Sequence, residues 1–156
     1  MVEGLGWRPP PSPWSDYYDT CSYSSVEREQ KATFALAAAR SVGRGVVRDL
    51  GCNEGTYARL AAGYADYVVA VDADHSTADR FYRSLRREGN ERILPLVMNL
   101  ADPTPGLGWR GSERHPLENR GRPDLVLCLA LVHHLRWEQT YPSKRSSPGW
   151  GRSALP

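Results

Sequence analysis

The sequence predicts an α/β fold in which a mostly parallel sheet lies between two layers of helices. Short apolar runs alternate with segments of helical spacing between residues 46 and 135, and this alternation is typical of βαβ units. The chain has 156 residues, of which 40% are hydrophobic and 24% are charged, as in an ordinary globular domain. We therefore expect a single core around a sheet that is buried on both faces.

The N-terminal part of the chain divides into an arm and a helix. Residues 1–23 are rich in Pro, Trp, Tyr and Ser, and the prolines at 9–11 disfavour both helix and central strand, so we expect an irregular arm. A helix should follow, because Ser24 and Glu27 have the spacing of a capping box and Gly43 provides a stop. The apolar side chains near helical spacing in this segment are Val26, Phe34, Leu36 and Ala37.

The central part of the chain alternates four predicted strands with helical and loop segments. The strands are expected in the apolar runs at 46–50, 67–74, 93–98 and 124–135. Helices are expected at 55–65 and 75–88, and the segment at 101–122 has the Gly, Pro and Arg content of a loop. We assign residues 24–135 to one domain.

The turn after the first strand is the first part of the candidate site, because ligands of parallel α/β sheets bind beyond the carboxyl ends of the strands. Asp49 stands near the end of the first run, and Gly51 and Gly55 allow the chain to turn tightly close to a ligand. Asn53 tolerates positive φ within this turn, and Cys52 lies beside it. The turn is therefore suited to close contact between backbone and ligand.

The next strand ends carry groups suited to a nucleoside. Asp72, followed by Ala73, lies in the second run, where a carboxylate can accept hydrogen bonds from both hydroxyls of a ribose. Asn99 and Leu100 follow the third run, and they offer an amide for the edge of adenine beside a side chain that can stack on its ring. We therefore expect a nucleoside in the site.

The glycine turn discriminates between nucleoside cofactors. The dinucleotide fingerprint G-x-G-x-x-G has its first glycine replaced by Asp49, and the phosphate-binding string G-x-x-x-x-G-K-[ST] is absent. An acid at this position repels a pyrophosphate, which disfavours an NAD-dependent oxidoreductase. It suits S-adenosylmethionine, which has a cationic amino-acid end as well as a ribose and an adenine.

Three segments together resemble the successive motifs of class I S-adenosylmethionine-dependent methyltransferases. They are VVRDLGCNEGTYARLAAGYADYVVAVDAD, LPLVMNLADP and PDLVLCLALVHHL. The stretch WSDYYDTCSYSSVEREQKATF also resembles the lead-in of a bacterial subgroup of such enzymes, some of them related to nodulation proteins. Two positions depart from the family pattern, namely Asn53, where glycine is commonest, and Asn99, where aspartate is usual.

The resemblance implies a seven-stranded, Rossmann-like three-layer sandwich and a methyl transfer that works by positioning the acceptor for in-line displacement. The expected cofactor contacts are Asp49, Gly51, Cys52, Asn53, Gly55, Asp72, Ala73, Asn99 and Leu100. The chemistry needs no covalent nucleophile, and His133 and His134 are candidates for a general base or a substrate-orienting group. Neighbouring histidines on a strand end point to opposite sides, so we expect no metal site.

The end of the chain departs from the family fold. Residues 136–156 are polar and rich in Pro and Ser, so we expect an irregular tail and a sheet without the family's last strands. An incomplete sheet leaves an open edge and an uncovered apolar face, through which copies could associate. One hypothesis for the tail is a shifted reading frame near Leu135. Codons can be chosen for the tail such that the neighbouring reading frame encodes apolar residues at helical spacing. The alternative function is then an inactive fragment that at most binds S-adenosylmethionine or a partner protein.

The composition of the chain indicates which partners and which cellular compartment to expect. The net charge is +2 with acids interspersed among the arginines, so nucleic acid is not indicated, and no apolar run has the length of a membrane span. The three cysteines fit neither a disulfide framework nor a zinc site, and no secretion signal is present, so we expect a cytoplasmic protein. The methyl acceptor stays unidentified, with a small molecule slightly favoured.

Overall fold

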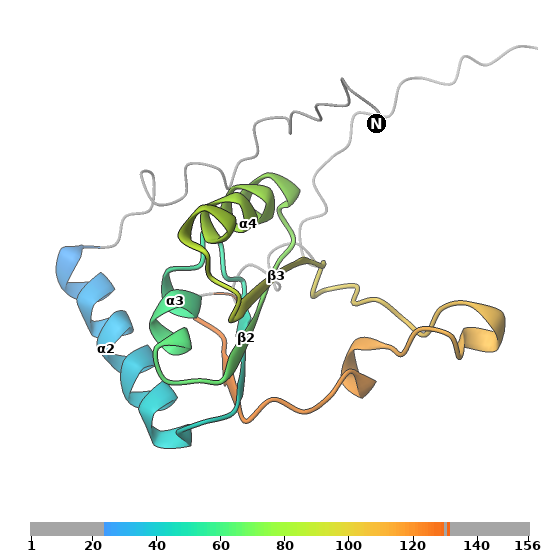
Figure 1. The fold of residues 1–156 in the computed structure, drawn as a ribbon, viewed down its shortest axis with the longest axis horizontal. Coiled ribbons are helices and arrows are strands. Elements are labelled where there is room, and N and C mark those ends of the chain that lie inside the picture. Colours follow the sequence, from blue (N-terminus) through green and yellow to red (C-terminus); the bar gives the residue numbers. More distant parts are fainter. Residues whose placement is uncertain (1–23, 130, 132–156) are drawn as a thin grey trace, which may run out of the picture.

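The computed structural model describes residues 24–129 and Leu131 and consists of alternating strands and helices (Figure 1). In chain order the elements are α2 (Ser25–Val42), β1 (Val46–Leu50), α3 (Thr56–Ala62), β2 (Tyr67–Asp72), α4 (His75–Glu88), β3 (Ile93–Val97) and β4 (Leu125–Leu127). Two short 3-10 turns, η1 (Trp109–Gly111) and η2 (Leu117–Asn119), precede β4. The expected arm at 1–23 and the expected tail at 136–156 lie outside the described residues.

The four strands form one parallel sheet in the order β3-β2-β1-β4. The first strand therefore lies inside the sheet, where Asp49 pairs in register with Ala70 of β2 on one side and with Leu127 of β4 on the other. The chain moves outward from β1 through β2 to β3 and then crosses back to the other side of β1. The strand order thus reverses beside β1, and this reversal is where open α/β sheets bind their ligands.

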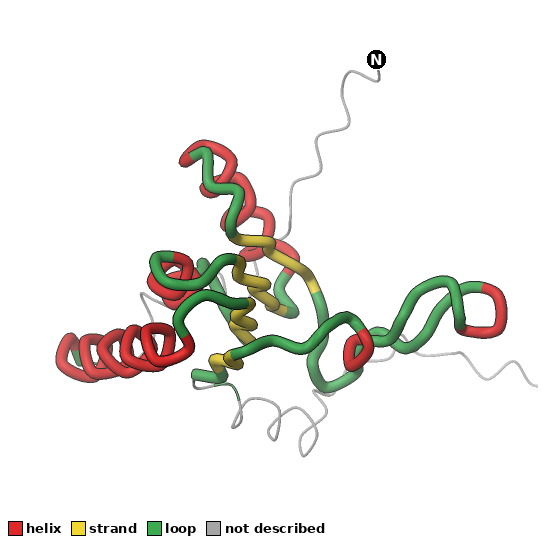
Figure 2. Tube along the Cα trace, turned by 60° about the horizontal axis from the view of Figure 1, so that its bottom comes forward, coloured by secondary structure: helices red, strands yellow, loops and turns green. Residues whose placement is uncertain are grey.

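The α-helices of the described residues, α2, α3 and α4, all pack on the same face of the sheet (Figure 2). Side chains from each helix and from alternate strand positions join in one buried cluster, as the two-residue period of a strand requires. Its members include Ala35 and Ala39 of α2, Ala58 and Ala61 of α3, Phe81 and Leu85 of α4, and Val47, Val68, Ala70, Ile93 and Leu127 of the strands.

The opposite face of the sheet is partly open in the part of the chain that the structure describes. Val46, Leu94 and Val126 point to this side, and they are 36%, 40% and 48% exposed. Arg48 lies among them and donates hydrogen bonds to the carbonyls of Arg120 (3.1 Å) and Gly121 (2.9 Å). The expectation of a sheet buried on both faces is therefore wrong for the described residues, whereas the expected uncovered apolar face is present.

Helix α2 has the predicted ends but packs through other residues than its apolar pattern suggested. Ser24 and Glu27 form the capping box, in which the Glu27 N–H donates to Ser24 Oγ (3.2 Å) and the Ser24 N–H donates to Glu27 Oε2 (2.7 Å). Val26 and Phe34 are 60% and 65% exposed, however, and the helix is buried at Ala35 and Ala39. These small side chains allow α2 to approach the rest of the core closely, so the larger residues stay outside.

The connection from β3 to β4 contains no α-helix and projects away from the sheet (Figures 1 and 2). Leu107 and Arg114 form an isolated antiparallel bridge that closes its outer turn, with Trp109 at the tip, 73% exposed. The loop predicted at 101–122 is thus confirmed, apart from the two 3-10 turns. Among the described helices, none has both the length and the apolar character needed to cross a membrane.

Candidate cofactor site

The turn between β1 and α3 is a tight left-handed structure at the carboxyl edge of the sheet. Gly51, Asn53 and Gly55 have φ values of 73°, 47° and 79°. A Cβ atom at Gly51 would lie 3.0 Å from Cδ1 of Leu131, and one at Gly55 would overlap the ring of Phe81 on α4. Gly55 is therefore needed for close packing as well as for its φ value, whereas Gly51 is favoured mainly by its φ value.

All five backbone N–H groups of this turn donate within the protein. Those of Gly51 and Cys52 donate to the carbonyl of Val71 at 2.8 and 3.0 Å, and that of Gly55 donates to the carbonyl of Cys52 at 2.8 Å. The Asn53 N–H donates to Asp72 Oδ2 at 2.8 Å, and the Glu54 N–H donates to Asn53 Oδ1 at 2.7 Å. No N–H group of residues 51–55 is left over for a phosphate.

Asp49 is the buried acid of the site. It is 1% exposed, and its Oδ2 atom has no hydrogen-bond partner among the described residues. Burial raises its pKa from 3.8 to about 7, and the nearby charge of Asp72 adds to the increase, while a hydrogen bond with the backbone of Ala58 opposes it. Asp49 thus supports the start of α3 and also has an acceptor atom that is not used by the described residues. Helix capping alone therefore does not explain why a carboxylate is buried at this position.

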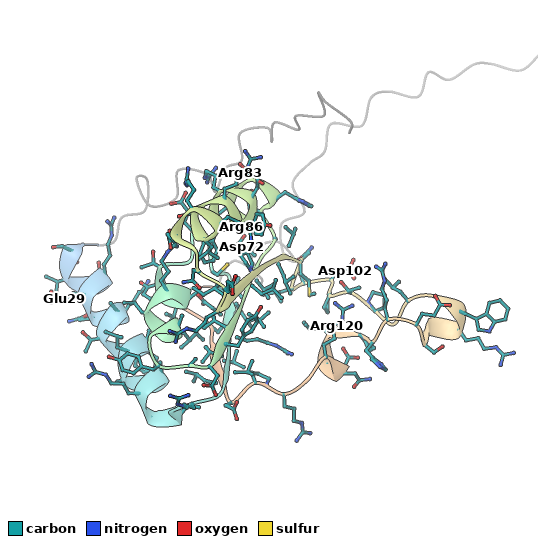
Figure 3. The ribbon with its side chains drawn as sticks, viewed as in Figure 1. Glu29, Asp72, Arg83, Arg86, Asp102 and Arg120 are labelled. Atoms are coloured by element: carbon teal, nitrogen blue, oxygen red, sulfur yellow. The ribbon has the colours of Figure 1, made fainter. Side chains whose placement is uncertain are left out.

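Asp72 joins the turn to the start of α4. Its Oδ2 atom accepts from Asn53 N–H at 2.8 Å, and its Oδ1 atom accepts from Asp74 N–H at 2.9 Å. Figure 3 shows Asp72 between α4 and the sheet, whereas Arg83 lies on the outer side of α4. Asp72 is half-buried, so each carboxylate oxygen keeps acceptor capacity toward a bound molecule.

The ends of β2 and β3 are brought together beside Asp72. Met98 N–H donates to the carbonyl of Asp72 at 2.8 Å, which places the residues after β3 next to the second strand end. Asn99 is exposed, and its Oδ1 atom accepts from Ala101 N–H at 2.9 Å, while Leu100 is half-buried. Ala73 is exposed next to Asp72.

Two groups of predicted site residues stand apart from this arrangement. The thiol of Cys52 lies in the hydrophobic core, where burial raises its pKa, which fits the interpretation of cysteine as a small packing residue. His133 and His134 lie outside the described residues, so their candidacy as substrate-side groups stays a prediction.

Two arginines that the sequence analysis did not single out hold the turn from outside. Arg59 of α3 donates to the Glu54 carbonyl at 2.7 Å, and Arg80 of α4 forms an ion pair with the Glu54 carboxylate at 3.1 Å. The Arg80 contact joins two segments that are far apart in the chain, whereas Arg59 and Glu54 are near neighbours in sequence, and no periodicity marks either contact. The only sequence signal is the charge of Glu54 inside an otherwise small-residue turn.

The strand order defines the class of fold. Parallel strands in the order 3-2-1-4, with a turn for ligand binding after the first strand, form the central part of a Rossmann-type sheet. The described part of the chain therefore has a Rossmann-like α/β fold, as the sequence resemblance implied. The expected second layer of helices is not found among the described residues, because α2, α3 and α4 lie on one face of the sheet.

Comparison with known proteins identifies one curated relative. The chain is 30% identical over 133 residues to the nodulation protein NoeA of Rhizobium meliloti (strain 1021). The match covers 84% of this chain but 28% of NoeA, so the chain spans less than a third of the length of this relative. No protein-family model matches the chain.

Similar solved structures are found among methyltransferases and other proteins. A chain of the Trypanosoma brucei PRMT1 enzyme–prozyme complex with AdoHcy has a TM-score of 0.48 at 20% identity and matches 55% of this chain and 28% of its own. Protein arginine methyltransferase 10 of Arabidopsis thaliana has a TM-score of 0.46 at 18% identity, with 52% and 24% covered. The YcgJ protein of Bacillus subtilis has a TM-score of 0.45 at 18% identity, with 50% and 34% covered.

Proposed function

We propose that this domain binds S-adenosylmethionine and takes part in methyl transfer to an acceptor. The observation that carries the proposal is the imbalance of hydrogen-bonding groups at the strand ends. Asp49 Oδ2 is a buried acceptor without a partner within the described part of the chain, whereas every N–H group of the turn at 51–55 is already used. Such a site favours a ligand that brings donors and positive charge.

S-adenosylmethionine fits this requirement at two places. Its ammonium group would meet the unpaired oxygen of Asp49, which needs a cation or a proton to offset its burial. Its ribose hydroxyls would donate to Asp72, whose two oxygens are held in place by backbone N–H groups. Asn99 would bind the edge of the adenine, and Leu100 would stack on its ring. The wall of the site would be formed by Gly51, Cys52, Asn53, Gly55 and Ala73.

The cofactor supplies a methyl group already activated by the sulfonium, so the protein mainly has to bind, align and exclude water. Asp49 and Asp72 would fix the amino-acid and ribose parts of the molecule and so orient the methyl group. We assign no catalytic base, and His133 and His134 stay candidates for one.

An NAD-dependent oxidoreductase is less well supported. A pyrophosphate requires donors at the turn, and Gly51–Gly55 offer none. The acid at Asp49 adds repulsion. Preferential binding of NAD over S-adenosylmethionine would therefore overturn the proposal.

A binding module without turnover is the second candidate function. It is favoured by the open sheet face at Val46, Leu94 and Val126, since parallel sheets normally have both faces covered. On this alternative the chain would bind the cofactor or a partner protein, with self-association through the sheet edge. We further propose a small-molecule acceptor, a cytoplasmic location, and no nucleic-acid or membrane partner.

Isothermal titration calorimetry with S-adenosylmethionine tests the site. Asp49→Asn should weaken binding, because a neutral amide cannot offset the ammonium charge. Asp66→Asn is the matched control, since Asp66 is an exposed acid whose ion pair with Arg44 (3.6 Å) lies away from the turn. Equal affinity in all three proteins, or no binding to folded wild type, would refute the proposal. A methyl-release assay over candidate acceptors then separates the enzyme from the binding module.

A further inference from the structure

Arg59 connects the glycine turn to helix α4 through one guanidinium group. It donates to the Glu54 carbonyl (2.7 Å) in the turn, and to Ser84 Oγ (2.8 Å) and Glu88 Oε1 (2.8 Å) on α4. The guanidinium carbon also lies 4.7 Å from the centroid of the Phe81 ring. The side chain is 32% exposed, so water screens these contacts only in part.

The same phenylalanine fills the space beside Gly55. Because a Cβ atom at Gly55 would overlap this ring, the turn and Phe81 have to keep a fixed separation. Arg59 packs on Phe81 and also binds Glu54, the neighbour of Gly55. Arg59 therefore constrains the position of the turn relative to α4 from two directions, in addition to the ion pair between Arg80 of α4 and Glu54.

The position of the turn also affects Asp72, through hydrogen bonds within the turn. Glu54 N–H donates to Asn53 Oδ1, and Asn53 N–H donates to Asp72 Oδ2, so displacement of Glu54 changes the support of Asp72. We propose that Arg59 is a positioning residue, which holds the turn in the conformation that binds the cofactor. This inference rests on the proposed function for the identity of the ligand, but the conformational part can be tested without a ligand.

Three variants separate this role from helix packing. Arg59→Ala removes both sets of contacts, whereas Glu88→Gln weakens the ion pair on α4 and leaves the hydrogen bond to Glu54. Arg40→Ala is the matched control, because Arg40 also stacks on a ring, that of Tyr64 at 5.0 Å, and hydrogen-bonds to its hydroxyl at 2.7 Å, but it does not contact the turn.

Amide hydrogen exchange and calorimetry supply the two measurements. Arg59→Ala should speed the exchange of the amides at 53–55 selectively and raise the Kd for S-adenosylmethionine about tenfold, as expected for a lost charged hydrogen bond. Arg59→Lys should restore part of both losses, while Glu88→Gln and Arg40→Ala should change neither. Unchanged turn exchange in Arg59→Ala, or an equal effect of Glu88→Gln, would overturn the inference. Failure of the wild type to bind S-adenosylmethionine would refute the proposed function instead, and the exchange rates would still decide the role of Arg59.

Discussion

The burial of Asp49 should make the stability of the fold fall as pH rises from about 4 to 7. The residue is 1% exposed, and desolvation raises its pKa from 3.8 to about 7. The folded chain therefore holds this proton more tightly than the unfolded chain. The corresponding stabilisation is fully present below pH 3.8 and is lost as pH rises through the folded pKa. This direction is opposite to the usual effect of paired carboxylates.

The size of the effect follows from the difference between the two pKa values. A difference between 3.8 and about 7 corresponds to an upper limit of ~4 kcal/mol. Asp49→Asn keeps the shape of the side chain but removes the ionisation. The difference in unfolding free energy between variant and wild type should therefore grow by ~1.4 kcal/mol per pH unit up to the folded pKa, and then stay constant.

Urea denaturation followed by far-UV circular dichroism at pH 5, 6, 7 and 8 measures this difference. This range lies above the region in which hydrogen bonds lower the pKa values of Glu27 and Glu88, so these carboxylates contribute little to the slope. Asp66→Asn provides the control, because an exposed acid should leave the pH profile unchanged. A constant difference between Asp49→Asn and wild type at all four pH values would refute the reasoning.

Three further predictions concern the turn and its ligand. Gly55→Ala should destabilise the fold by more than ~2 kcal/mol, because its φ is 79° and its Cβ atom would overlap Phe81, whereas Gly63→Ala (φ −68°) should change thermal unfolding little. Asp72→Ala should weaken S-adenosylmethionine binding by ~2–4 kcal/mol in calorimetry, and equal affinity would exclude a ribose contact. Below pH 7, binding of this cation should release a proton from Asp49, so calorimetric enthalpies should differ between buffers of different ionisation enthalpy.

Local signals were enough to predict most elements of the fold. The capping box at Ser24 and the stop at Gly43 define α2, and the apolar runs at 46–50 and 93–98 correspond to β1 and β3. Each of these signals acts within a few residues of the element that it starts, ends or fills. For the same reason the carboxyl ends of the strands, and with them Asp49 and Asp72, could be located before the structure was known.

The packing of α2 could not be predicted in this way. Spacing singled out Val26 and Phe34 as apolar side chains, but the helix is buried at Ala35 and Ala39. Which side of a helix faces the core depends on how closely its neighbours approach, and two alanines allow an approach that larger side chains prevent. The spacing of apolar residues carries no information about how closely a neighbouring element approaches. It therefore cannot tell whether the face with Val26 and Phe34 or the face with Ala35 and Ala39 is buried.

The chemistry of the site depends on the same distinction between local and distant information. The sequence identifies an acid before a glycine turn, but it does not tell whether the turn still has free N–H groups or whether the acid is desolvated. Both properties depend on residues from other strands and helices, namely Val71, Asp72 and Ala58. Once the N–H groups are used and Asp49 is buried, the site can gain more from a donor-rich cation than from a phosphate. The choice between S-adenosylmethionine and a dinucleotide therefore rests on tertiary hydrogen bonds rather than on the glycine spacing alone.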